Sequence, residues 1–127
     1  MSMQATTFVD DEVLSNLGGL SRAQVDALPY GAVKVDEEGT VLLYNRYESE
    51  LAGVEPSDAE GQIFFTEVAP CTNNRMFFGK FEEGVEAGEL DEVFNYTFTY
   101  RMSPTLVSIH MRHDADSDAN WIFVKKS

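Results

Sequence analysis

The single cysteine of this 127-residue chain follows a proline in the turn-like segment EVAPCTNN, just before a stretch rich in phenylalanine. A lone thiol among aromatic residues is most often an inert, buried side chain. Cys71 is followed by Thr72 and Asn73, however, and loops of this kind often carry functional groups. Two interpretations therefore compete: a structural core thiol, or a thiol that holds a covalently attached small molecule.

Tyr44 and Glu48 form a second candidate pair. They lie about one helical turn apart if a helix begins near Asn45, so both side chains could meet one ligand group. Spacing alone favours a solvated carboxylate at Glu48. His110 and His113 lack the spacing of a metal site, and the sequence has no glycine-rich phosphate loop, Ser/His/Asp arrangement or HExxH motif. The residues by themselves give no positive sign of enzyme chemistry.

The first 28 residues are predicted to form a helical cap. Ser21 and Gln24 have the spacing of a capping box at the start of a short helix. Pro29 then closes the segment. We therefore divide the chain into a cap, residues 1–28, and a core, residues 29–127.

The core is predicted to contain two strands, several short helices and three further strands. Asn45 can cap a helix that stops at Gly53, and a second helix ends at Gly88. The side chains that recur at every second position of the next strand face one side: Phe94, Tyr96, Phe98, Tyr100 and Met102. This order predicts an α+β domain, in which an antiparallel sheet carries helices on one face and leaves a pocket between the two layers.

The charge of the chain is strongly acidic. It has 22 acidic and nine basic residues, which gives a formal net charge of −13. Without a basic patch that could neutralise phosphates, nucleic-acid binding is not expected. Repulsion of this size destabilises a compact domain at low ionic strength and is screened at high salt. We interpret it as adaptation to a salt-rich cytoplasm; the alternative is an ordinary acidic protein.

The sequence also bears on the compartment. No stretch approaches the roughly 20 apolar residues of a membrane span, and the N-terminal residues lack the features of a secretory signal. One cysteine cannot form an internal disulfide, which fits a reducing compartment. We expect a cytoplasmic monomer that does not bind membranes.

Five segments of the chain resemble the photoactive yellow protein family, blue-light receptors with the PAS fold. The segments are LLYNRYESELAG, GQIFFTEVAPCT, FFGKFEEGV, FNYTFTYRMSPT and WIFVKK. They occur in the right order over nearly the whole chain, which is more specific than any one motif. The resemblance implies a PAS fold with a central five-stranded antiparallel sheet, helices on one face and an N-terminal helical cap.

The resemblance also implies a 4-hydroxycinnamoyl chromophore, derived from p-coumaric acid and joined to Cys71 by a thioester. Tyr44 and Glu48 would donate hydrogen bonds to its phenolate. Light would isomerise its double bond, Glu48 would pass a proton to the phenolate, and partial unfolding of the cap would signal to a separate, unidentified protein. The implied pocket lining comprises Val33, Ala52, Val54, Phe64, Val68, Ala69, Thr72, Phe98, Tyr100 and Met102.

Two positions depart from the family pattern. Ala52 stands where the family type has a threonine beside the tyrosine hydroxyl, and Val54 stands where it has an arginine over the pocket. Loss of a hydroxyl neighbour and of a nearby cation should each raise the pKa of the chromophore phenol. We therefore expect more of the protonated chromophore near neutral pH than in relatives that keep both residues.

Two other functions stand beside the photoreceptor. One is a PAS domain that senses a non-covalent ligand or mediates protein contacts, which would not take up a chromophore at Cys71. The other is an enzyme with Cys71 as its nucleophile, although no histidine lies near Cys71 in the sequence to activate it. Loss of chromophore uptake in Cys71→Ala or Cys71→Ser would separate the photoreceptor from both.

Overall fold

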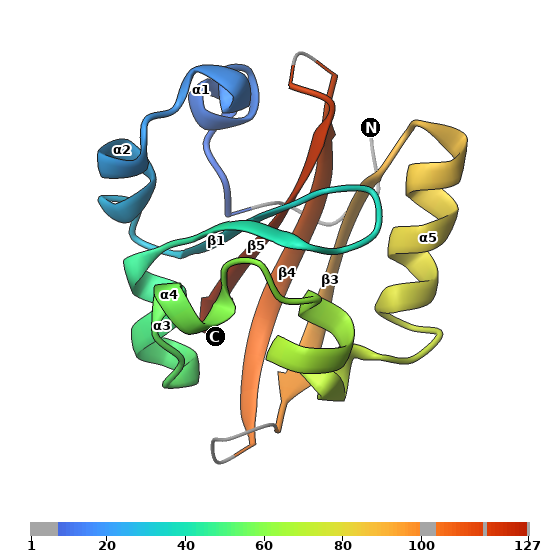
Figure 1. The fold of residues 1–127 in the computed structure, drawn as a ribbon. Helices are drawn as coiled ribbons and strands as arrows, with labels where there is room; N and C mark the ends of the chain where they lie inside the picture. The colour runs from blue at the N-terminus through green and yellow to red at the C-terminus, as the bar shows by residue number, and fades with distance from the viewer. Residues whose placement is uncertain (1–7, 100–103, 116, 127) are drawn as a thin grey trace.

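A computed structural model describes residues 8–99, 104–115 and 117–126. Their elements form one five-stranded antiparallel sheet with short helices around it (Figure 1). The strands are β1 (Gly31–Val35), β2 (Val41–Tyr44), β3 (Asp91–Phe98), β4 (Thr105–Asp114) and β5 (Ala119–Lys126). The helical segments are α1 (Asp11–Leu14), η1 (Leu17–Gly19), α2 (Arg22–Asp26), α3 (Arg46–Ala52), α4 (Pro56–Ala59), η2 (Phe64–Val68), η3 (Pro70–Thr72) and α5 (Phe78–Ala87).

The last strand lies at the centre of the sheet. The spatial order is β2-β1-β5-β4-β3, with antiparallel pairs throughout. Residues 119–124 of β5 are all buried, because both faces of this central strand are covered. Strand β2 is an edge strand, so some of its N–H groups point away from the sheet.

The two faces of the sheet carry separate cores. Ile122 and Val124 belong to the larger core, to which η2 and α5 contribute side chains. Trp121 and Phe123 alternate with them and belong to the smaller core, together with Val25 of α2. The cap therefore packs on the face opposite to α5, and α1 and α2 lie together there (Figure 1). The predicted α+β architecture is confirmed, and the structure adds which face the cap covers.

The predicted helix ends are found where capping residues place them. Ser21 accepts a hydrogen bond from the Gln24 N–H while the Gln24 side chain accepts one from the Ser21 N–H, a complete capping box. Asn45 caps α3 with its side chain. That helix ends at Gly53, whose positive φ of 72° favours glycine.

The aromatic side chains of β3 share one face, as predicted. Phe98 is buried in the larger core, and Phe94 and Tyr96 pack against it. Asn95 and Thr97 are exposed on the other side. Tyr100 and Met102, the remaining members of the predicted series, lie outside the described residues.

Candidate functional site

The helix that carries Glu48 is anchored by the Asn45 side chain. Asn45 is fully buried and its Oδ1 accepts hydrogen bonds from the N–H groups of Glu48 (3.1 Å) and Ala32 (2.9 Å). Its Nδ2 donates to the carbonyls of Val25 (2.8 Å) and Tyr30 (3.0 Å). One amide thus fixes the start of α3 to β1 and to the cap.

The Glu48 side chain points into the protein interior and is only 1% exposed. Its Oε1 has no hydrogen-bond partner within the described part of the chain. A Cβ on Gly31 would clash with this oxygen in its present position, so the carboxyl packs closely against a glycine of β1. Burial raises the pKa of Glu48 to about 8. Near neutral pH the carboxyl is therefore mostly protonated and can donate a hydrogen bond.

Tyr44 ends β2 and is buried opposite Val33 of β1. Burial, and then the charge of Glu48, raise the pKa of Tyr44 well above its ordinary value. Its hydroxyl therefore stays protonated over the working pH range. Tyr44 and Glu48 are therefore two buried, protonated groups, and they are near enough to interact electrostatically.

Cys71 lies in the middle of η3, half-buried, and packs against the larger core that contains Tyr44. Its carbonyl accepts hydrogen bonds from the Tyr96 hydroxyl and from Asn74 Nδ2 (3.2 Å). Thr72 is buried and its hydroxyl donates to the Ala69 carbonyl (2.6 Å). The backbone around the thiol is therefore held in a fixed turn.

Asn74 and Tyr96 were not among the sequence-derived site residues. Asn74 Nδ2 also donates to the Tyr96 hydroxyl at 2.5 Å, and its Oδ1 accepts from the Phe77 N–H at 3.0 Å. The one available signal was that Asn74 follows Cys71 by three residues in a turn, a position from which Asn often bonds to nearby backbone. The contact with Tyr96 joins residues 22 positions apart and has no local signal.

Most of the expected pocket residues gather around one core. The larger core contains Val33, Phe64, Val68 and Phe98 together with Tyr44, and Val54 and Ala69 pack against it. Ala52 is half-buried at the end of α3 and does not belong to that cluster. As noted for β3, Tyr100 and Met102 fall in a stretch that the structure does not describe.

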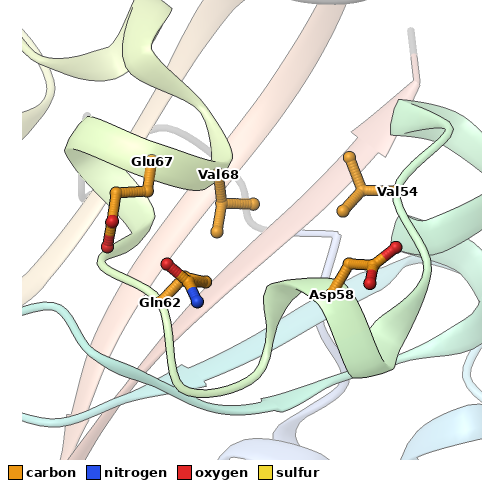
Figure 2. Close-up of a pocket in the computed structure, with 5 residues that line it drawn as sticks. All are labelled: Val54, Asp58, Gln62, Glu67 and Val68. Atoms are coloured by element: carbon orange, nitrogen blue, oxygen red, sulfur yellow. The ribbon is translucent and has the colours of Figure 1, made fainter.

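A cavity of about 160 Å³ opens between the α3–α4 connection, α4 and η2. Figure 2 shows Val54 and Val68 facing each other across it. Asp58, Gln62 and Glu67 complete the lining, so none of the five lining residues carries a positive charge. Whether Val54 leaves a bound phenolate without a nearby cation, and what this does to the chromophore, stays a prediction.

The fold is that of a PAS domain. A family model described as the PAS fold matches residues 19–124. A curated photoactive yellow protein from Rhodothalassium salexigens is 43% identical over 98% of this chain and 99% of its own length. Another from Halochromatium salexigens is 40% identical over the same shares.

A solved structure of the same family is also similar to this chain. The photoactive yellow protein domain of the sensor histidine kinase Ppr from Rhodospirillum centenum has a TM-score of 0.83 and 46% identity, covering 88% of this chain and 98% of that domain. The chain therefore belongs to the photoactive yellow protein family of PAS photoreceptors. Within the described ranges, no helix is long and apolar enough to cross a membrane.

Proposed function

We propose that this protein is a cytoplasmic blue-light receptor that binds 4-hydroxycinnamic acid as a thioester on Cys71. The observation that carries the proposal is the buried, protonated carboxyl of Glu48, which has an unpartnered oxygen and interacts electrostatically with the equally buried Tyr44. A buried polar atom without a partner is costly unless a ligand satisfies it. The names of the relatives support a chromophore as that ligand.

The donor set fits a phenolate. A free phenol has a pKa near 10, and burial alone raises it further because burial penalises the anion. Two hydrogen bonds from Tyr44 and protonated Glu48 would oppose this, since hydrogen bonds to an ionised acceptor are about twice as strong as neutral ones. Bound in this way, the chromophore supplies absorption of blue light and a double bond that isomerises.

Glu48 is proposed to convert light absorption into a structural change. It would hold a proton in the dark and give it up toward the phenolate in the light, which would leave a buried carboxylate without its partner. Such an uncompensated charge costs several kcal/mol, comparable to the stability of a weakly held substructure. Because Asn45 bonds both the Glu48 N–H and the Val25 carbonyl, the cap is the neighbouring unit that can be released.

The receptor is proposed to signal through contact with a separate protein rather than by catalysis. In the Rhodospirillum centenum protein a photoactive yellow protein domain is part of a sensor histidine kinase. A signalling protein is therefore the class of partner that we propose for the light-exposed state of this chain.

The test is to load the purified apoprotein with activated p-coumaric acid and to record its absorption before and after a blue flash. We expect a visible band that bleaches and recovers, and that is absent in Cys71→Ala. Mass spectrometry should show one added acyl group on wild type and none on the variant. A folded wild-type protein that stays colourless would contradict the proposal and favour a PAS domain with a non-covalent ligand.

A further inference from the structure

Glu60 makes two contacts that join distant parts of the fold. Its Oε2 accepts a hydrogen bond from Arg22 Nη2 of the cap at 2.8 Å and another from the Tyr44 N–H at 3.1 Å. Glu60 follows α4 directly and its side chain is 26% exposed. A single carboxylate oxygen therefore bridges the cap helix α2 and the end of β2.

The geometry of β2 explains why Tyr44 uses this acceptor. In an antiparallel pair, successive N–H groups of an edge strand point alternately toward the partner strand and away from it. The Asn45 N–H points inward and donates to the Ala32 carbonyl at 3.1 Å. The Tyr44 N–H therefore points outward from the edge of the sheet, where it donates to Glu60 Oε2.

The cap reaches both members of the donor pair. Asn45 Nδ2 donates to the Val25 carbonyl, and the Arg46 N–H donates to Asp26 Oδ1 at 3.0 Å, so the cap bonds to the start of α3. These bonds hold the helix that carries Glu48. The corresponding link to Tyr44 runs through Glu60, which pairs with Arg22 and accepts the Tyr44 N–H. The Arg22–Glu60 pair joins opposite charges, so salt screens it.

We propose that Glu60 is a positioning residue for Tyr44, and that Arg22 makes this positioning depend on a docked cap. The inference rests on the proposed function, because it concerns the phenolate donor Tyr44. Coupling between two sites is reciprocal. A cap that leaves its place removes Arg22 from Glu60 and loosens Tyr44, and a dark-state cap that stays docked holds Tyr44 at the phenolate.

The first test uses the full chain without chromophore and measures amide hydrogen exchange by NMR at Tyr44 and at Val25 in α2. We compare wild type, Arg22→Gln, Glu60→Gln and the double variant. Arg22→Gln should speed exchange at both amides by about two- to fivefold, as expected for a partly exposed ion pair. The double variant should be no faster than the faster single variant, because both changes break one contact. One molar NaCl should shrink the difference between wild type and Arg22→Gln.

The matched control is Glu92→Gln, which removes the charge from an exposed pair with Lys80 at 3.6 Å between β3 and α5, away from the cap. It should leave both amides unchanged. Faster exchange at Val25 but not at Tyr44 in Arg22→Gln would overturn the proposal, because Glu60 would then only hold the cap. Additive effects of the two changes would also overturn it.

The second test repeats Arg22→Gln in the chromophore-loaded protein in the dark. The midpoint of the absorbance titration should move upward relative to wild type and to Glu92→Gln, since a loosened Tyr44 stabilises the phenolate less. An unchanged midpoint would overturn the inference. If no variant and no wild type acquires a band, the proposed function fails, while the amide measurements still decide whether Glu60 positions Tyr44.

Discussion

Burial of Glu48 changes its protonation state near neutral pH. Its carboxyl lies against Gly31 with one oxygen unpartnered in the described structure, and its pKa is raised to about 8 by burial. The folded protein therefore keeps a proton that the unfolded chain loses near the ordinary glutamate pKa of about 4.3. Between these two values the folded state binds more protons, so stability falls as the pH rises.

This difference predicts the behaviour of Glu48→Gln in the apoprotein. The free energy of unfolding of wild type minus that of the variant should fall from about pH 5 to about pH 8, by up to about 1.4 kcal/mol per pH unit. Above the folded pKa the difference should level off. Urea unfolding at pH 5, 6.5 and 8 measures it.

The exposed Glu50, on the same helix, provides the control. Glu50→Gln should follow the wild-type pH dependence closely. Parallel pH dependences for wild type and Glu48→Gln would show that Glu48 is not buried as a neutral acid.

At the scale of elements, the meeting of the α3–α4 connection, α4 and η2 forms a cavity. Val54 in the α3–α4 connection and Val68 of η2 face each other across a cavity whose other lining residues are acidic or neutral (Figure 2). Packing of these elements brings Val54 against the core that contains Tyr44. If the proposed chromophore places its phenolate beside Tyr44, a cation at position 54 would act on it from the neighbouring side of this core.

Val54→Arg should therefore lower the pKa of the bound chromophore, by up to about one unit at such a partly exposed position. An absorbance titration of the loaded protein measures the change. Val54→Gln is the control, because it adds a long polar side chain without charge. Equal titration midpoints for the Arg and Gln variants would contradict the electrostatic explanation.

At the scale of the whole molecule, the net charge of −13 lowers the stability of the folded state through repulsion between like charges. The Debye screening length falls from about 30 Å at 0.01 M salt to about 3 Å at 1 M. Repulsion between surface carboxylates therefore weakens strongly as salt is added. The Arg22–Glu60 pair opposes this trend locally, since salt weakens attraction as well as repulsion.

We expect the melting temperature of the protein to rise by several degrees between 0.01 M and 1 M NaCl. The salt for this experiment is a chloride, because sulfate stabilises apolar burial in any protein and would hide the effect of charge screening. Circular dichroism melting curves measure the change. A melting temperature that hardly moves would favour an ordinary acidic protein over adaptation to a salt-rich cytoplasm.

The sequence by itself determined the short-range features. The Ser21–Gln24 capping box, the Asn45 cap and the Gly53 stop depend on hydrogen bonds and backbone angles within a few residues, so local spacing was enough to predict them. The period-two ladder of β3 is equally local. Cys71, Tyr44 and Glu48 were candidates by position and spacing, and resemblance to a family added the prediction that they hold a chromophore.

The tertiary structure decided what depends on elements that are distant in the chain. Spacing alone favoured a solvated Glu48, whereas the fold buries its carboxyl against Gly31, 17 positions earlier in the chain. The link from Arg22 through Glu60 to Tyr44 likewise joins three separate elements. Burial and charge pairing depend on which elements pack against each other in the folded protein. Local sequence patterns do not contain that information.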